Sequence, residues 1–153
     1  MISKKTKYGL QALLSLAREH GLGPILIADL AEQERIPKKF LELILLQLKN
    51  AGILGSRKGK GGGYFLARDP AQITLGSAIR VLEGPLAPIP CASETGYQKC
   101  EECLDENTCG IRLVMKDVRN AIADILDHTS LKDVLVRSDE ASKMLAGVID
   151  FTI

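Results

Sequence analysis

Apolar residues in the first fifty positions recur at the spacing of helix faces. Residues 6–20 predict an amphipathic helix, because their apolar positions fall at i, i+3, i+4 and i+7. That stripe comprises Leu10, Leu13, Leu14 and Ala17. Similar patterns predict a short helix over 26–34 and a longer one from Pro37 to about Lys49, since proline is favoured at the first helical position. Two short helices joined by a tight turn are typical of a helix-turn-helix.

Residues 53–67 carry the pattern of a β-hairpin, directly after the second of these helices. Two short apolar runs flank the glycine-rich turn 59–63, and Asp69-Pro70 ends the second run. A hairpin in this place is typical of the wing of a winged helix-turn-helix. A flexible loop with solvated lysines is the alternative, and the helix pair just before it favours the wing.

The second half of the chain predicts helices on either side of an irregular segment. A helix is expected over 74–83 with Thr74 as its N-cap, whereas residues 85–108 lack periodicity. The longest helix is expected over 109–128, where a long apolar seam indicates dimerisation; packing back on its own domain is the alternative. The seam comprises Ile111, Val114, Met115, Val118, Ile122, Ile125 and Leu126. A short helix is expected over 129–137, and 138–153 gives only a weak indication of a helical tail.

These elements predict a mainly α fold, a winged helix-turn-helix with a short β-hairpin wing. The expected divisions are a DNA-binding domain over residues 1–84, a cysteine-rich loop over 85–108, and a long dimerisation helix with a C-terminal tail over 109–153. Hydrophobic residues make up 46% of the chain, which suffices for a core, and the 4% of aromatic residues leave that core to aliphatic side chains.

The charge of the chain is divided unevenly, although the net charge is only +1. Residues 1–70 hold 12 Lys and Arg against 6 Asp and Glu, while residues 71–153 hold 8 against 13. A basic first half can meet a polyanion such as DNA, although ordinary variation in surface charge is the alternative.

No signal peptide or membrane span is expected. The apolar run from Leu10 to Ala17 is interrupted by Gln11 and Ser15, and no stretch approaches the roughly 20 apolar residues of a membrane helix. We therefore expect a cytoplasmic protein. Thiols stay reduced in that compartment, so its cysteines are better read as metal ligands or redox sensors than as structural disulfides.

All four cysteines fall within nineteen residues of the irregular segment. They are Cys91, Cys100, Cys103 and Cys109. An iron–sulfur cluster, a structural zinc ion and a thiol–disulfide switch are all compatible with this spacing. Acidic neighbours such as Glu101 and Glu102 should raise the thiol pKa values, which argues mildly against a bare thiolate.

The stretch from Ile36 to Arg68 resembles winged-helix regulators of the IscR/NsrR/CymR type. Its most specific mark is the Gly62-Gly63-Tyr64 of the wing. The opening Thr6-Lys7-Tyr8-Gly9-Leu10, and Leu82-Glu83-Gly84-Pro85 followed by a cysteine loop, continue the resemblance over about residues 1–135. The resemblance implies a homodimeric transcription regulator that binds near-palindromic operators on double-stranded DNA.

Several members of that family carry an iron–sulfur cluster on a three-cysteine loop, a pattern that Cys91, Cys103 and Cys109 fit. The positions of the known non-cysteine ligands hold Arg112 and, by apparent alignment, Lys7. The resemblance therefore makes Cys100 the candidate fourth ligand of a [2Fe–2S] or [4Fe–4S] cluster. An all-cysteine site also leaves zinc as an alternative cofactor.

The candidate DNA contacts lie on the second helix of the pair and on the wing. Lys38, Lys39 and Glu42 should reach base edges in the major groove. Arg57, Lys58 and Lys60 should contact the DNA backbone or minor groove, and Gly61 and Gly62 should let the wing backbone approach closely.

Two other functions compete with a cluster-sensing regulator. A DNA-binding protein with a purely structural zinc and a small iron–sulfur electron carrier both use the cysteines, but the carrier leaves the basic wing unexplained. Catalysis and a small-molecule substrate are not expected. The two histidines, His20 and His128, lie near predicted helix ends, and the glycines of 59–63 lack the ending of a phosphate-binding loop.

Overall fold

The computed structural model describes residues 2–151 as six helices and one β-hairpin. The first four helices are α1 (Lys4–Arg18), α2 (Ile27–Glu34), α3 (Lys38–Asn50) and α4 (Leu75–Leu82). The hairpin strands β1 (Leu54–Arg57) and β2 (Gly63–Leu66) lie between α3 and α4. Helices α5 (Gly110–Asp127) and α6 (Leu131–Phe151) complete the chain, and short 3-10 turns occur at Pro70–Gln72 and Pro90–Ala92.

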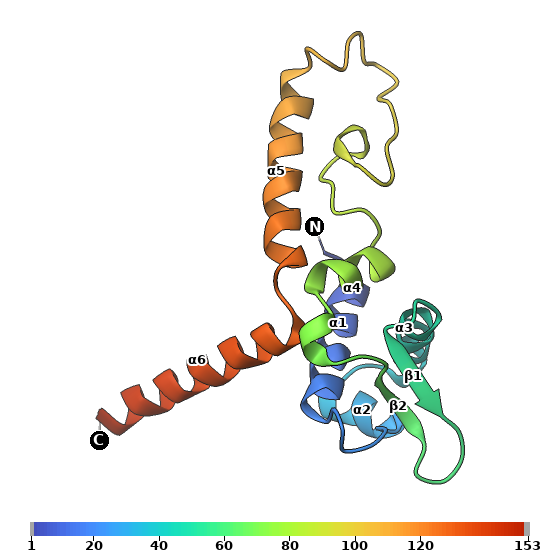
Figure 1. Cartoon of the computed structure of the whole chain (residues 1–153), viewed down its shortest axis with the longest axis vertical. Helices are drawn as coiled ribbons and strands as arrows, with labels where there is room; N and C mark the ends of the chain where they lie inside the picture. Colours follow the sequence, from blue (N-terminus) through green and yellow to red (C-terminus); the bar gives the residue numbers. More distant parts are fainter. Residues whose placement is uncertain (1, 152–153) are drawn as a thin grey trace.

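Helices α1 to α4 and the hairpin form a body around one aliphatic core (Figure 1). The predicted stripe of α3 is confirmed, because Leu41, Ile44, Leu45 and Leu48 are fully buried. Leu13 of α1 and Leu30 of α2 meet this stripe, as expected for helices that each present one apolar face to a shared core. The body therefore holds α3 from one side and leaves its opposite side exposed.

The turn between α2 and α3 fixes the helix-turn-helix. Arg35 ends α2 in the left-handed conformation with φ 55°, and the Ile36 N–H donates to the Ala31 carbonyl at 2.9 Å. This pattern is a common helix C-cap. Pro37 was predicted to be the first helical residue of α3, but it is the N-cap, and the helix begins one residue later, at Lys38. Proline is tolerated at either position, because the backbone N–H that it lacks has no hydrogen-bond partner within the helix there.

The hairpin is the predicted wing, and it is attached to the body by a backbone bridge. Its strands pair antiparallel, with Ser56 opposite Tyr64. Ile25, in the segment after α1, exchanges two backbone hydrogen bonds with Tyr64, of 2.9 and 2.8 Å. These bonds fix the base of the wing beside the helix-turn-helix, while its tip projects from the body (Figure 1).

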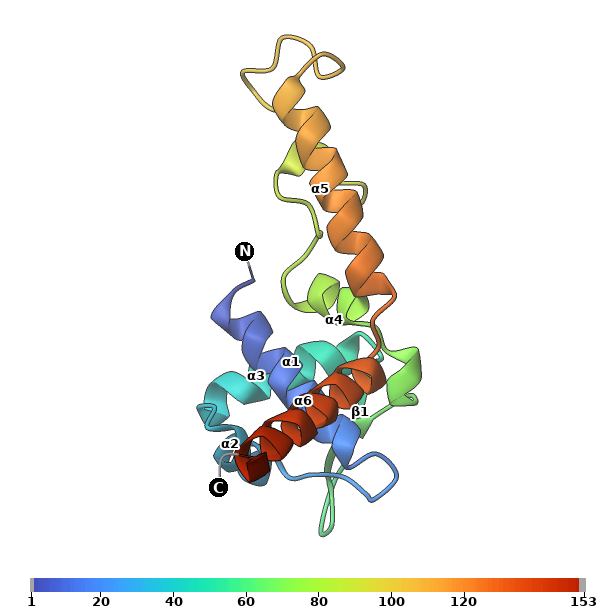
Figure 2. The ribbon, with the colours of Figure 1, turned by 90° about the vertical axis from the view of Figure 1, so that its left-hand side faces the viewer.

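Helix α5 and the cysteine-rich loop form an arm that extends away from the body. Figures 1 and 2 both show the loop, residues 85–109, running out along α5 and turning at the far end of the arm, opposite to the wing tip. None of the described residues of α5 is fully buried. The arm is therefore held by polar contacts and partial packing rather than by the aliphatic core.

Helix α6 differs from the sequence prediction. Residues 131–151 form one continuous helix of 21 residues, so α6 is longer than the 18 residues of α5, which was predicted to be the longest. The charged stretch 137–143 interrupts the apolar pattern but consists largely of residues that tolerate a helix, which is why periodicity alone missed it. Leu131 is fully buried in the body, Leu135 packs against the core, and Asp139 pairs with Arg18 of α1, whereas the second half of α6 projects sideways (Figures 1 and 2).

Within residues 2–151, no helix combines the length and the apolar content that crossing a bilayer requires.

Candidate DNA interface and cysteine pocket

The exposed side of α3 carries the side chains that were predicted to face DNA. Lys38, Lys39 and Glu42 are all exposed in the first turns of the helix. Among the described residues, no side-chain hydrogen bond or salt bridge involves any of the three. Two basic groups and one acceptor are therefore available to an external partner at the N-terminal end of α3.

The wing adds three exposed basic side chains. Arg57 ends β1, and Lys58 and Lys60 lie in the turn. Gly61 is exposed, whereas Gly62 is buried and its N–H donates to the Gly59 carbonyl at 3.0 Å, so Gly62 serves the turn itself.

The Gly-Gly-Tyr motif has a structural cause. Gly63 adopts φ 141°, and a Cβ at this position would lie 2.2 Å from the Ile25 carbonyl oxygen. A Cβ on Gly62 would lie 2.2 Å from the Arg57 carbonyl oxygen. A side chain at position 63 would therefore distort the bridge that anchors the wing, and one at position 62 would distort the turn of the hairpin.

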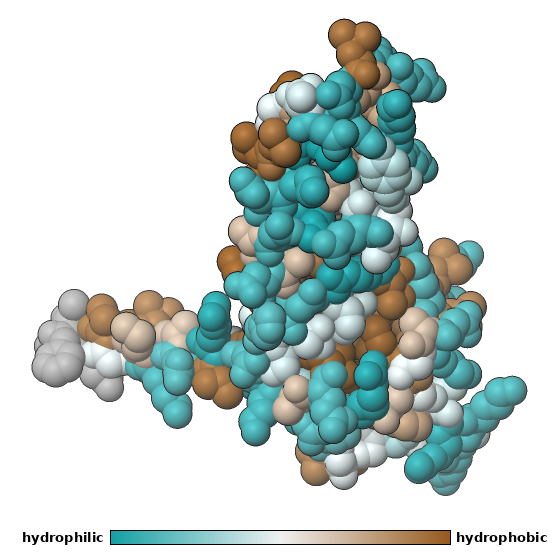
Figure 3. All heavy atoms as spheres, turned by 45° about the horizontal axis from the view of Figure 1, so that its top comes forward, coloured by the Kyte–Doolittle hydropathy of each residue, from teal (hydrophilic) through white to brown (hydrophobic). Residues whose placement is uncertain are grey.

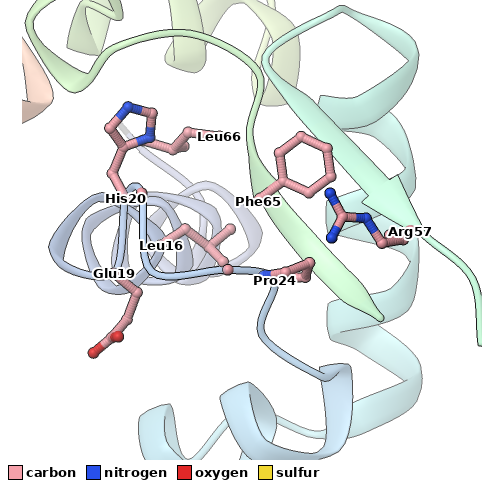
Figure 4. Close-up of a pocket in the computed structure, with 9 residues that line it drawn as sticks. Leu16, Glu19, His20, Pro24, Arg57, Phe65 and Leu66 are labelled. Atoms are coloured by element: carbon pink, nitrogen blue, oxygen red, sulfur yellow. The ribbon is translucent and has the colours of Figure 1, made fainter. Parts of the chain in front are cut away.

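A shallow pocket of about 240 Å³ lies where the wing meets the end of α1 (Figure 4). Leu16, Phe65 and Leu66 form its apolar part, and Arg57 lies beside Phe65. His20 lies on the α1 side of the pocket, while the Glu19 carboxylate points away from it (Figure 4). The pocket is therefore formed jointly by the wing and the end of α1.

The four cysteines line one pocket at the far end of the arm. This pocket has a volume of about 420 Å³, and apolar side chains including Ile89, Leu104 and Ile111 share its lining. Cys91, Cys103 and Cys109 are half-buried, and Cys100 is exposed. Within residues 2–151, no three His, Cys, Asp or Glu side chains are close enough together to hold a metal ion as they stand.

Two cysteines in this pocket have a defined local environment. The Cys100 thiol donates to a Glu102 carboxylate oxygen at 3.2 Å, and this hydrogen bond raises the pKa of Cys100. The expected effect of acidic neighbours is therefore confirmed for this thiol. Cys109 is the N-cap residue of α5, so the loop enters the helix at a cysteine.

Arg112 connects the two ends of the cysteine segment. Its Nε donates to the Cys91 carbonyl at 2.9 Å, and one terminal nitrogen donates to the Glu106 carbonyl at 3.3 Å. Arginine has only donors, so Arg112 cannot be a metal ligand and instead holds the loop closed. Sequence reasoning noted this position as a departure from the family pattern but missed its role, because a contact with a distant backbone carbonyl leaves no trace in the pattern.

One ion pair holds the two parts of the arm together, and another attaches the arm to the body. Arg119 of α5, only 14% exposed, pairs with Glu94 of the loop at 2.6 Å. At the base of the arm, Asp127 receives a two-pronged contact from Arg80 of α4, at 2.6 and 2.9 Å. The hydrogen bond from Arg80 lowers the pKa of Asp127. This fork geometry fixes orientation as well as distance.

The beginning of α1 is attached to the end of α4 by Glu83. Its carboxylate accepts from the Ser3 hydroxyl at 2.7 Å, from the Ser3 N–H at 3.0 Å and from the Thr6 hydroxyl. These hydrogen bonds, chiefly that of Thr6, lower the pKa of Glu83 to about 2. The motifs 6–10 and 82–85 of the sequence therefore meet in space.

Comparison with known proteins agrees with this geometry. The profile of the Rrf2 family, described as "Iron-dependent Transcriptional regulator", matches residues 2–137. HTH-type transcriptional regulator CymR of Bacillus subtilis is 35% identical over 138 residues, covering 90% of this chain and 91% of its own length. HTH-type transcriptional regulator IscR of Serratia proteamaculans is 26% identical and covers 90% of this chain and 80% of its own length.

Solved structures give the same assignment. The structure of CymR, the global cysteine regulator of B. subtilis, superposes with a TM-score of 0.72 at 34% identity, covering 88% of this chain and 95% of that one. The structure of T. potens IscR gives a TM-score of 0.74 at 31% identity, covering 92% and 90%. These matches confirm the winged helix-turn-helix and a regulatory rather than enzymatic protein. The chain belongs to the Rrf2 family of DNA-binding helix-turn-helix transcriptional regulators, and it is related to both CymR and IscR.

Proposed function

We propose that this regulator senses redox state, nitric oxide or iron–sulfur status through an iron–sulfur cluster held by its four cysteines. The observation that carries the proposal is the single pocket lined by Cys91, Cys100, Cys103 and Cys109. Some members of the family bind such clusters through cysteines, and the family description names iron dependence.

The residues of the pocket fit a cluster by their chemistry. Cysteine thiolates are the usual ligands of iron–sulfur clusters, and a partly apolar lining limits access of water to the iron. The loop must draw its cysteines inward to bind, which is compatible with its irregular backbone. When bound, a cluster supplies a centre that reacts with oxidants or nitric oxide. The chain's own contribution is to hold the loop against α5 through Arg112 and Arg119.

The proposed DNA contacts are the exposed residues of α3 and the wing. Lys38, Lys39 and Glu42 would meet base edges, because the N-terminal part of a recognition helix enters the major groove. Arg57, Lys58, Lys60 and the backbone of Gly61 would meet phosphates or the minor groove.

The proposed active form is a homodimer formed through α5. Its exposed apolar side chains include Ile111, Val114, Val118 and Ile125, which share one face of the helix. Figure 3 shows apolar side chains at the surface of the arm among polar ones. A second copy would cover this face and set the spacing of the two recognition helices on a near-palindromic site.

A continuous series of contacts supports coupling between the two sites. The cysteine loop contacts α5 through Glu94 and Arg119, and α5 contacts α4 through Asp127 and Arg80. Helix α4 in turn accepts a hydrogen bond at the Val81 carbonyl from Gln47 of α3, at 2.6 Å. A change in the loop can therefore shift the recognition helix through side chains in direct contact.

A structural zinc ion is the alternative occupant, because four thiolates also suit tetrahedral zinc. Anaerobic purification followed by an absorption spectrum and iron, sulfide and zinc analysis distinguishes the two. We expect visible absorption with iron and sulfide in the wild type. We expect this absorption to be lost in Cys109→Ala and to be kept in the control variant Ser142→Ala, on α6. Colourless protein with stoichiometric zinc would replace the sensing proposal with the structural one.

A further inference from the structure

Two leucines occupy the outward face of the recognition helix. Leu43 is 65% exposed and Leu46 is 47% exposed, although both belong to the helix whose other leucines are fully buried. Single exposed apolar residues are common and need no explanation. Here the two lie one turn apart at the centre of the surface that the DNA-binding fold directs at its partner.

Helical geometry places Leu43 between the polar residues of that face. The buried stripe of α3 runs through Leu41, Ile44, Leu45 and Leu48. At 100° per residue, the side directly opposite comprises Lys39, Leu43, Leu46 and Asn50, at spacings of four, three and four. An apolar centre is therefore flanked by a basic residue towards the N-terminus of α3 and an amide towards its C-terminus.

We propose that Leu43 reads thymine by packing against its C5-methyl group in the major groove. The inference rests on the proposed orientation of α3 in DNA. Thymine is the only base that presents a methyl group on the major-groove edge, and apolar side chains recognise it by contact. Leu43 is one turn from Lys39 and next to Glu42, so it lies within the part of the helix expected to reach base edges. Leu46 is further from that end of α3.

A second protein is the other conceivable partner for exposed leucines, and DNA is favoured by the charge around them. Lys39 precedes Leu43 by one turn on the same exposed side, Lys38 is also exposed at the start of α3, and the basic wing residues come next in the chain. A partner at this surface must therefore carry negative charge next to an apolar group. The thymine-bearing strand of a duplex offers both, through its phosphates and its methyl groups.

The test removes one methyl group at a time from bound DNA. Duplexes that bind the full-length wild-type protein are first selected from a random pool, and each thymine of the selected site is then replaced by deoxyuridine. At one or more symmetric thymine positions, we expect each lost methyl group to weaken wild-type binding about fourfold, the factor that corresponds to about 0.8 kcal/mol. The Leu43→Ala variant should bind the thymine and deoxyuridine duplexes equally at those positions.

Leu145→Ala is the matched control, because Leu145 is 63% exposed, close to the 65% of Leu43, and lies in the second half of α6, outside α3, the wing and the cysteine loop. This variant should keep the wild-type sensitivity to deoxyuridine. Sensitivity that persists in Leu43→Ala, or wild-type binding that no deoxyuridine changes, would overturn the inference. Failure of the selection to enrich any duplex would instead overturn the proposed orientation of α3, and the inference with it. Leu43→Ala removes no buried group and introduces a better helix former, so unchanged thermal unfolding verifies its fold.

Discussion

The Glu83 carboxylate shows how one exposed side chain can connect two elements of the DNA-binding body. It accepts three hydrogen bonds from Ser3 and Thr6, and it thereby holds the start of α1 at the end of α4. Its position directly before Gly84 and the cysteine loop places this contact at the junction between the body and the arm. The contact depends on ionisation, so its contribution to stability depends on pH.

Glu83→Gln is expected to remove a pH-dependent part of the stability. The folded-state pKa of Glu83 is about 2, below its usual value of 4.5. Its stabilising contribution is therefore complete above pH 4.5 and is lost as the pH falls towards 2. Urea unfolding should show a stability difference between wild type and Glu83→Gln at pH 6 that narrows by pH 3. Glu140→Gln, on the exposed part of α6, should follow the wild type; a constant Glu83→Gln difference across this range would contradict the prediction.

Lys60 offers a test of the wing at the same scale. Its exposed side chain lies in the turn between β1 and β2, where a phosphate contact is proposed. Lys60→Ala should weaken binding to all duplexes and reduce the slope of log K against log salt by about one per bound protomer. Lys143→Ala, exposed on α6, is the control. An unchanged slope in Lys60→Ala would mean that this lysine contacts no phosphate.

At the scale of elements, α5 presents an exposed apolar face. Val114, the second residue of its apolar seam, is 57% exposed. Introducing a charge there as Val114→Glu should shift the protein from dimer to monomer, because a buried unpaired carboxylate is costly in an interface. Sedimentation velocity measures the change. Leu22→Glu, at a 78% exposed leucine after α1, should remain dimeric; a dimeric Val114→Glu would place the interface elsewhere.

Elements with a strong local signal were predictable from the sequence. The stripe of α3, the Thr74 cap of α4 and the Gly-Gly-Tyr turn each depend on neighbours within a few residues, and the structure confirms them. The stripe of α1 was predicted only in part, because Leu13 and Ala17 are buried whereas Leu10 and Leu14 are half-buried, and Ala12 and Leu16 complete the buried face. Helix α6 was not predictable in full. Its second half has no described core contact, and its apolar spacing is broken by charged residues.

The candidate sites likewise have a part that the sequence predicts and a part that only the folded structure shows. Basic residues on α3 and the wing follow from their place in predicted elements, and four cysteines in one loop follow from counting. The contacts of Arg112, Arg119 and Asp127 join residues between 6 and 47 positions apart, so only the folded chain brings them together. The three-part division at residues 84 and 108 stays a prediction, although Leu131 of the expected third part lies in the core of the first.

At the scale of the whole molecule, the tip of the wing, which is part of the proposed DNA-binding surface, and the cysteine loop lie at opposite ends (Figure 1). The contacts of α5 with α4, which include the Arg80–Asp127 pair, connect the arm to the body, together with backbone hydrogen bonds that join Leu75 to Thr129 and Leu131 to Ile73. The same arm carries the proposed dimer face. A small change at the pocket can therefore alter the separation of two recognition helices without changing either body.

The most direct measurement is the dissociation constant for a selected duplex and for a random-sequence duplex, determined anaerobically at one salt concentration with metal-loaded and metal-free protein. The account predicts binding of the selected duplex at least about a thousandfold tighter in one of the two states. It also predicts that the preference changes when the metal is removed. Equal affinity for both duplexes in both states would contradict the proposed DNA-binding surface. A preference for the selected duplex that is the same with and without the metal would contradict the proposed sensing role.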